Sequence, residues 1–307
     1  MKIISYTLNK EFRFGIMTSK STFIDISEIL KTDNILDFIE NFSRYQNLIN
    51  SMNLNTLQEI KIDSVNIVSP IPSPTSLRDA YAFRQHVETS RKNRGLNMID
   101  TFDRFPVYYY SNHKSVKGPG VVRVEESLSE MLDYELEIAV IIGKKGINIS
   151  AQEADKYIFG FTIMNDFSSR KIQRDEMKLN LGPAKGKDFA TSLGPSILTS
   201  DELLDRAIPT KNGNHYDIDL RAELNGKTIS HDNLKNMSWT FAQIIERISN
   251  GTYIYPGEVI GSGTCATGCL YELNSNPGSK PYWLQDGDDI SITAQKIGSL
   301  NNKIKII

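Results

Sequence analysis

Short apolar segments recur along this chain, and most of them alternate with polar residues or are rich in β-branched side chains. Such segments predict β-strands, because the side chains of a strand point alternately to its two faces. The pattern predicts strands at 2–7, 12–17, 22–25, 60–68, 107–110, 121–124, 136–142, 159–164, 196–198, 218–224, 253–260 and 290–295. Strands at this density indicate an α+β fold that is mostly β.

Helical spacing of apolar residues is less common along the chain. Ser76 is a candidate N-terminal cap and Gly95 a candidate stop for one such segment. The pattern predicts helices at 35–49, 77–94, 151–154 and 239–250. Few helices are therefore expected beside the larger number of strands.

A proline-rich segment divides the chain. Residues 69–74 read Ser-Pro-Ile-Pro-Ser-Pro, and three prolines in five residues interrupt any regular element. We place a domain boundary here, with a small β-rich N-terminal domain at 1–68 and a main domain at 69–307.

Composition excludes several classes of partner. The 307 residues are 39% hydrophobic and 23% charged, with a formal net charge of −2, so neither nucleic acid nor an anionic membrane is expected as a partner. Apolar runs are too short for a membrane span, and the N-terminus lacks a signal-peptide core. Only Cys265 and Cys269 are present, which predicts reduced structural thiols in a cytoplasmic protein.

Two glutamates at the start of the strand 136–142 are the first candidates for chemistry. Glu135 and Glu137 are two positions apart, so on a strand they project to the same side, roughly 7 Å apart. Two such carboxylates repel each other unless a cation or solvent lies between them. The pair therefore indicates a hard divalent metal site, with a solvated outer face as the alternative.

Polar residues gather in three further segments. On the helix predicted over 77–94, Asp79 and His86 would share a face, although Asp79 could be a cap and His86 a buried structural histidine. The segment 160–173 runs from an apolar strand into Asn-Asp, which leaves the carboxylate of Asp166 at the end of the strand. Arg170 and Gln173 follow, three positions apart, and would lie on one turn of a helix. The alternative is a helix cap followed by a solvated arginine.

The third segment, 181–189, places Lys187 after a glycine, so that its ammonium group could approach a bound anion or lie in a simple turn. Taken together, these segments supply several carboxylates, one histidine and two cations. An all-oxygen set of ligands favours Mg²⁺, Mn²⁺ or Ca²⁺ over zinc or copper.

At these segments the sequence resembles the fumarylacetoacetate hydrolase family. The matching motifs are Asp-Tyr-Glu-Leu-Glu at 133–137, the GFxxMNDxSxRxIQ pattern at 160–173, Gly-Lys-x-Phe at 186–189, Pro-Gly-Glu-Val-Ile-Gly-Ser-Gly-Thr at 256–264 and DxYxxRQH at 79–86. The match covers about residues 70–295. It implies a C-terminal mixed β-sandwich roll, a smaller N-terminal β domain and a homodimer.

The resemblance also implies roles for individual residues. The metal is expected to be Mg²⁺, with Mn²⁺ or Ca²⁺ as alternatives. Its ligands would be Asp79, Glu135, Glu137 and Asp166. His86 would be the general base, oriented by Glu272. The substrate and its developing negative charge would be held by Arg170, Gln173 and Lys187, and the pocket would be lined by Tyr81, Tyr109 and Thr264. A further substrate-binding arginine is expected after the histidine, and Arg91 and Arg94 are both candidates.

Family members act on 2-oxo acids and β-diketones. The resemblance therefore implies a metal-dependent hydrolase that cleaves a C–C bond in a fumarylacetoacetate-like or acylpyruvate-like diketo acid. A lyase or isomerase acting on a 2-oxo acid through the same enolate chemistry is the alternative, and a non-catalytic binding protein on the same fold is a third reading. The sequence does not distinguish among the possible substrates.

Overall fold

The structure is a computed structural model that describes residues 1–275 and 280–307. In the described part, a twelve-stranded sheet follows the order β4-β3-β2-β1-β14-β12-β11-β19-β6-β7, with β5 beside β1 and β8 beside β14. Its strands are β1 (Lys2–Leu8), β2 (Glu11–Met17), β3 (Thr22–Asp25), β4 (Glu59–Lys61), β5 (Asn66–Ile67), β6 (Leu77–Ala80), β7 (Tyr108–Ser111), β8 (Val116–Lys117), β11 (Leu136–Ile142), β12 (Ile158–Asp166), β14 (Thr191–Thr199) and β19 (Val259–Gly261).

A second sheet has the order β18-β17-β20-β21-β9. Its strands are β9 (Gly120–Val124), β17 (Asp219–Leu224), β18 (Lys227–Asn233), β20 (Asp289–Ala294) and β21 (Gly298–Ile306). Two short pairs complete the strands of the described residues: β10 (Leu132–Asp133) with β13 (Ser168–Ser169), and β15 (Ala207–Thr210) with β16 (Gly213–Tyr216). The observed class is therefore α+β and mostly β, as predicted.

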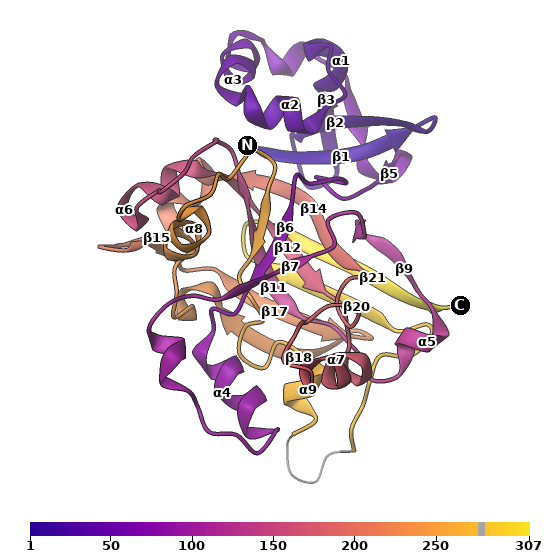
Figure 1. Cartoon of the computed structure of the whole chain (residues 1–307). Helices are drawn as coiled ribbons and strands as arrows, with labels where there is room; N and C mark the ends of the chain where they lie inside the picture. The colour runs from indigo at the N-terminus through magenta and orange to yellow at the C-terminus, as the bar shows by residue number, and fades with distance from the viewer. Residues whose placement is uncertain (276–279) are drawn as a thin grey trace.

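Helices flank these sheets (Figure 1). The described helices are α1 (Ser27–Leu30), α2 (Ile35–Glu40), α3 (Phe42–Ser51), α4 (Arg84–Lys92), α5 (Glu126–Ser129), α6 (Ala151–Ala154), α7 (Arg170–Met177), α8 (Phe241–Ser249) and α9 (Leu270–Leu273). Among the described residues, no helix combines the length and the apolar character that crossing a membrane would require.

Strand β11 is the centre of the main core. All seven of its residues are buried, because the strand has neighbours on both edges and packed side chains on both faces. Ile138 and Val140 join the larger core, which the second sheet also lines, whereas Ala139 and Ile141 join the core shared with the N-terminal region. The alternation along one strand thus assigns its residues to two hydrophobic cores.

The N-terminal region continues the main sheet. Strand β1 pairs antiparallel with β14, with Lys2 opposite Leu198, and Phe38 of α2 packs against Phe159 of β12. Figure 1 shows this region as the indigo part at the top of the molecule. The domain boundary at 68/69 stays a prediction.

The helix predicted over 77–94 is wrong in its first half. Leu77–Ala80 forms β6, which lies parallel to β19 and antiparallel to β7, and only Arg84–Lys92 is helical. Main-chain hydrogen bonds to two neighbouring strands decide the conformation of β6, and a local apolar pattern does not report such neighbours. Asp79 and His86 therefore do not share a helical face.

Other predicted boundaries also change. The helix predicted over 35–49 is divided at Asn41, which caps the end of α2 and precedes α3. Of the strand predicted over 253–260, only the last two residues belong to a strand, β19, and Ile254 forms an isolated bridge with Gly146. The segment 60–68 contains two short strands with a 3₁₀ turn between them. Strands β15, β16, β18 and β21 were not predicted, because their polar, half-exposed sequences carry a weak pattern.

Candidate active site

One cavity of about 800 Å³ collects most of the predicted site residues. The predicted residues that line it are Asp79, Tyr81, His86, Tyr109, Glu135, Arg170, Gln173, Lys187 and Thr264. Glu137, Asp166 and Glu272 do not line it, but each contacts a residue that does. The structure thus brings together residues from segments that are almost 200 positions apart in the sequence.

Three carboxylates form the innermost group, which we call the carboxylate group: Asp79, Glu135 and Glu137. One oxygen of each lies within 4.8 Å of the others. Strand β19 separates β6 from β11, and its residue Gly261 is paired with Asp79. A Cβ atom at Gly261 would lie 2.4 Å from Asp79 Oδ1 and 3.0 Å from Glu137 Oε2. The glycine therefore leaves the space into which the two carboxylates project.

The electrostatics of the carboxylate group suit a cation. Burial, followed by the charge of Asp166, raises the pKa of Asp79 to about 7. Burial and then the charges of Asp79 and Glu135 raise the pKa of Glu137 well above its usual range. In the described part of the chain, Glu137 Oε2 is buried and accepts no hydrogen bond. An all-oxygen set with an unpartnered buried acceptor fits a hard divalent cation.

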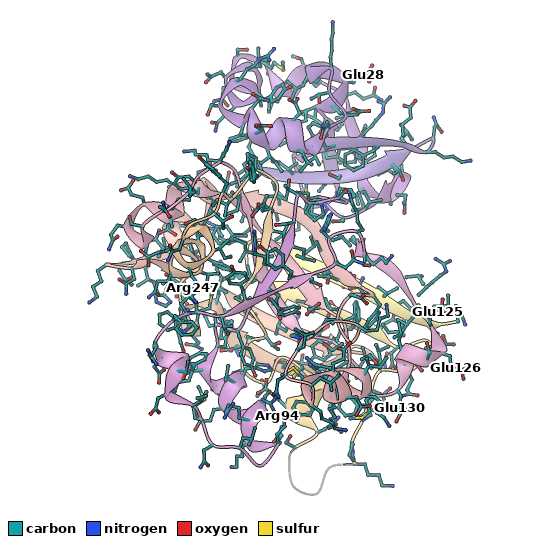
Figure 2. All side chains as sticks on the ribbon, in the orientation of Figure 1. Glu28, Arg94, Glu125, Glu126, Glu130 and Arg247 are labelled. Carbon is teal, nitrogen blue, oxygen red and sulfur yellow. The ribbon has the colours of Figure 1, made fainter. Side chains whose placement is uncertain are left out.

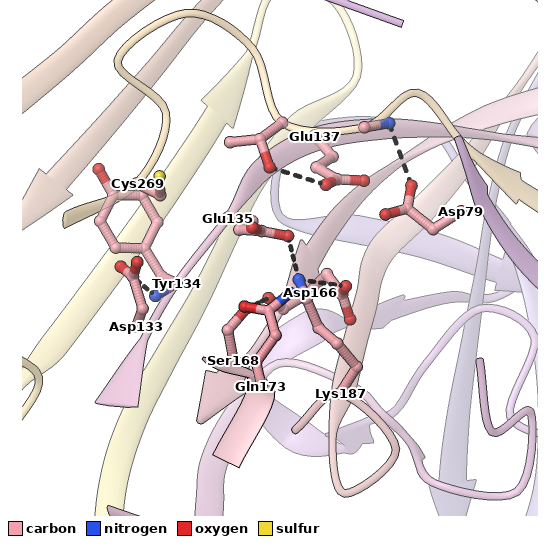
Figure 3. Close-up of polar contacts among 12 residues, drawn as sticks. Asp79, Asp133, Tyr134, Glu135, Glu137, Asp166, Ser168, Gln173, Lys187 and Cys269 are labelled. Carbon is pink, nitrogen blue, oxygen red and sulfur yellow. Dashed lines mark hydrogen bonds and ion pairs between the residues drawn. The ribbon is translucent and has the colours of Figure 1, made fainter. Parts of the chain in front are cut away.

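Lys187 lies between Glu135 and Asp166 (Figure 3). Its Nζ forms ion pairs with Glu135 and with Asp166 Oδ2, the latter at 2.7 Å. Burial acts to raise the pKa of Glu135, but the positive charges of Lys187 and then Arg170 outweigh it and lower that pKa to about 2. Asp166 also accepts hydrogen bonds from Tyr109 and from Thr191 Oγ1. Asp166 as a metal ligand therefore stays a prediction, because its nearest cationic partner in the structure is Lys187.

His86 and Glu272 form a buried pair at the side of the cavity. His86 Nδ1 is hydrogen-bonded to Glu272 Oε1, and Thr267 donates its backbone N–H to Glu272 Oε2 at 3.3 Å. Both members of the pair are buried: His86 is 5% exposed and Glu272 is 4% exposed. His86 comes from α4 and Glu272 from the short α9, whose contact with α4 brings the two side chains together. A hydrogen bond at Nδ1 leaves Nε2 as the nitrogen that can exchange a proton with a bound molecule.

Arg170, the first residue of α7, holds the other side of the carboxylate group. Its guanidinium donates to Asp133 Oδ2 and to Glu135 Oε1, both at 2.8 Å, and to Gln173 Oε1 at 3.0 Å. The predicted helical turn that joins Arg170 and Gln173 is therefore present. Gly186 allows this arrangement, because a Cβ there would lie 2.8 Å from the backbone nitrogen of Gln173.

Asp133 joins two parts of the site, and the sequence motifs assigned it no role. Its fully buried carboxylate binds Arg170 and also accepts the backbone N–H groups of Leu270 and Tyr271, at 2.7 and 3.0 Å. One side chain thus positions both Arg170 and the first turn of α9, which carries Glu272. Its place in the Asp-Tyr-Glu-Leu-Glu motif was the signal available in the sequence.

The remaining predicted residues also reach the cavity. The ring of Tyr81 lies edge-on to His86, with 5.5 Å between centroids, and Thr264 Oγ1 donates to Glu137 Oε1 at 3.3 Å. Of the two candidate arginines, Arg94 lines the cavity, whereas Arg91 Nε donates to the carbonyl of Asn97 and lies outside it. Figure 2 shows Arg94 near the end of α4.

Comparison with protein families finds one match. The family description "Fumarylacetoacetate (FAA) hydrolase C-terminal" matches residues 75–305, which is most of the chain. The matched range contains every residue of the cavity described above.

Individual proteins are also similar to this chain. Oxaloacetate tautomerase YisK of Bacillus subtilis (strain 168) is 27% identical over 249 residues, covering 79% of this chain and 74% of its own length. Fumarylacetoacetase of Oryza sativa subsp. japonica is 33% identical over 202 residues, covering 54% and 47%. The solved structure of fumarylacetoacetate hydrolase from psychrophilic Exiguobacterium antarcticum matches over 100% of both chains, with 25% identity and a TM-score of 0.77.

Proposed function

The chain belongs to the fumarylacetoacetate hydrolase family, and we propose that it is a metal-dependent hydrolase that cleaves a C–C bond in a β-diketo acid. The observation that carries the proposal is the placement of the His86–Glu272 pair beside the carboxylate group in one cavity. A general base next to a cation site is what hydrolytic attack on a carbonyl requires.

The metal site of this proposal consists of Asp79, Glu135 and Glu137, with Asp166 behind Lys187. A divalent cation bound there, Mg²⁺ or Mn²⁺, would polarise the carbonyl oxygens of a chelating 2-oxo acid and stabilise the enolate that leaves. Within the carboxylate group, the charges of Lys187 and Arg170 keep Glu135 ionised.

In this proposal, one residue transfers the proton and others stabilise the negative charge. His86 Nε2 takes a proton from a water molecule, and the resulting hydroxide adds to the carbonyl carbon. The C–C bond next to that carbonyl breaks, its electron pair passes to the departing enolate, and His86 returns the proton to the enolate carbon. Glu272 keeps the ring oriented through Nδ1, while Arg170 and Lys187 face the negative charge that develops.

Two arginines at the outer part of the cavity favour a substrate with a second carboxylate. Arg94 donates to the carbonyl of Ser90, and Arg174 contacts Met131 Sδ and lies over the ring of Tyr271. Within residues 1–275 and 280–307, neither forms an ion pair with a carboxylate, and both line the cavity. Guanidinium groups bind carboxylates through paired hydrogen bonds. A fumarylacetoacetate-like diacid therefore suits the cavity better than a simple acylpyruvate.

Replacing Arg174 with Gln is expected to raise KM for a diketo diacid by roughly tenfold, because a charge-assisted hydrogen bond contributes about 1.5–3 kcal/mol. The KM for acetylpyruvate, which has no distal carboxylate, should remain within about twofold. Steady-state kinetics on both substrates measure the difference. Lys171→Gln removes a charge from the same helix, outside the cavity, and is the control. Equal changes in KM for both substrates would contradict the distal role.

Labelled water tests the proposed reaction. Incubation with fumarylacetoacetate or an acylpyruvate and Mn²⁺ in ¹⁸O-water should place the label in the newly formed carboxylate, and the ultraviolet band of the diketone should disappear. Mass spectrometry of the products measures the label. Loss of the band without label, or no reaction with any diketo acid, would reject the hydrolase.

A tautomerase or isomerase acting on a 2-oxo acid is the second candidate. The similarity to oxaloacetate tautomerase, which covers more of this chain than the similarity to the rice fumarylacetoacetase, is the observation that favours it. This reaction would use His86 to move a proton between carbon and oxygen and would need no hydrolytic water. Exchange of the C3 protons of oxaloacetate with deuterium, without C–C cleavage, would identify it.

A further inference from the structure

The sequence contains no cluster of cysteines and histidines, but the fold assembles one mixed set of donors. His86, Cys269 and Glu272 each offer one ligand atom, and these atoms lie within 4.8 Å of one another. Cys269 Sγ is 3.8 Å from Glu272 Oε1. Cys269 is 0% exposed, and it immediately precedes the helix that carries Glu272. We call this set of three residues, His86, Cys269 and Glu272, the thiol group of the site; the name refers to all three side chains and not to the –SH of Cys269 alone.

The chemistry of the thiol group differs from that of the carboxylate group. It offers one nitrogen, one sulfur and one oxygen, whereas the carboxylate group offers only oxygens. Mg²⁺ and Ca²⁺ prefer oxygen ligands, and Zn²⁺ and Cd²⁺ prefer sets that include sulfur and nitrogen. Three protein ligands with a fourth position left to water or another molecule form a sufficient zinc site. His86 lines the cavity, and Cys269 and Glu272 are buried next to it.

We propose that His86, Cys269 and Glu272 bind a thiophilic divalent cation, Zn²⁺ or Cd²⁺, at a second metal site that inhibits the enzyme. On binding, the thiol proton leaves to solvent and the ring proton of His86 moves from Nδ1 to Nε2, so that Nδ1, the thiolate and Glu272 face the ion. The ion bonds to Cys269 Sγ, to His86 Nδ1 and to one oxygen of Glu272. No oxidant or further reactant is needed.

Inhibition follows from what the ion removes. Glu272 no longer accepts the hydrogen bond from His86, and the positive charge of the ion makes the ring a weaker base. The carboxylate group is left intact, so a hard cation and a soft cation can bind at the same time. Excess Mg²⁺ should therefore fail to reverse the inhibition. This part of the inference rests on the proposed function, whereas the binding of the ion does not.

The test is a titration of the Mg²⁺-saturated protein with Cd²⁺, without substrate, in which ultraviolet absorbance reports Cd²⁺–thiolate bonds. One Cd²⁺ per chain should produce the band in the native protein. It should persist in Cys265→Ser, which removes the other buried thiol, and disappear in Cys269→Ser. Zn²⁺ should displace the bound Cd²⁺ and abolish the band.

Two measurements keep the test decisive. His86→Gln should keep the band but weaken Cd²⁺ binding by at least tenfold, on the order of the loss seen when a metal site is disturbed. Where the enzyme is active, the Zn²⁺ concentration that halves the rate should rise at least about tenfold in Cys269→Ser, relative to the zinc-free rate of that variant. Near-ultraviolet circular dichroism checks the fold of each variant.

The outcomes separate this inference from the proposed function. No band in the native protein, or a band that is lost with Cys265→Ser and kept with Cys269→Ser, would overturn the second site. A band with the expected dependence in a protein that hydrolyses no diketo acid would leave the site standing and reject the hydrolase. Inhibition that excess Mg²⁺ reverses would show that Zn²⁺ competes at the carboxylate group, and would overturn the inhibitory role.

Discussion

Replacing His86 with Ala is expected to lower kcat for diketo-acid cleavage by roughly 10²–10⁴-fold, the usual contribution of a positioned general base. His86 is the titratable ring in the cavity, and Glu272 holds it through Nδ1. Cation binding should persist, because Asp79, Glu135 and Glu137 do not depend on the ring. Steady-state kinetics, together with a thermal shift on adding Mn²⁺, measure both parts.

Two variants calibrate that result. Glu272→Gln keeps a hydrogen-bond acceptor for His86 Nδ1 but removes the negative charge of the carboxylate, so an intermediate loss of kcat is expected with little change in KM. His113→Ala removes a histidine that does not line the cavity and should leave the rate within about twofold. Full activity in His86→Ala would reject the histidine as the base.

Addition of Mg²⁺ or Mn²⁺ is expected to raise thermal stability strongly, and more at pH 8 than at pH 6. At 100 times Kd a ligand that binds only the folded state stabilises it by about 2.7 kcal/mol. The pH dependence follows from Asp79. Its pKa rises from 3.8 to about 7 on folding, so the metal-free folded state binds this proton more tightly than the unfolded state does.

This shift in the pKa of Asp79 determines how the stability of the metal-free protein changes with pH. The stabilisation that the Asp79 proton provides is present below pH 4 and is lost as pH rises through about 7. Each pKa unit corresponds to about 1.4 kcal/mol. A bound cation replaces the proton and removes the repulsion, so its stabilising effect grows over this pH window. Thermal unfolding at several pH values, with and without the cation, measures the difference.

Glu137→Gln separates this mechanism from general salt effects. The change puts a neutral amide in place of a buried carboxyl whose ionised form is disfavoured by burial and by the charges of Asp79 and Glu135. The metal-free protein should therefore be at least as stable as the native one. The stabilisation by Mn²⁺ should fall to a small fraction, and activity should be lost with it. Glu130→Gln, at an exposed carboxylate paired with Lys171, is the matched control. A cation effect of native size in Glu137→Gln would contradict the assignment.

Local patterns predicted the central part of the fold well. The strand 136–142 was predicted with its observed bounds, because a run of β-branched residues between polar segments reports both its conformation and its burial. The helix 151–154 was also predicted correctly. Leu77–Ala80 was misread as helical, since its conformation depends on pairing with β19 and β7. Long-range pairing of this kind leaves no periodic signal in the segment itself.

In the candidate site, too, local motifs identified residues, whereas long-range packing decided which of them are in contact. Sequence motifs identified the residues around the cavity, including Glu135, Glu137 and Lys187. They did not identify the role of Asp133, because its partners Arg170 and Leu270 lie 37 and 137 positions away. Neither did they show that Asp166 forms its ion pair with Lys187. Such relations depend on how separate segments pack.

By itself, the sequence determined the mostly β character of the protein, its family and a set of candidate residues for chemistry. These properties depend on residue types and on short spacings, which each segment carries locally. Only the tertiary structure decided which groups share a cavity and which carboxylates repel one another. It also decided that a cysteine, read as a structural thiol, lies beside His86 and Glu272. Distances and burial set these interactions, and both arise only when segments far apart in the chain pack together.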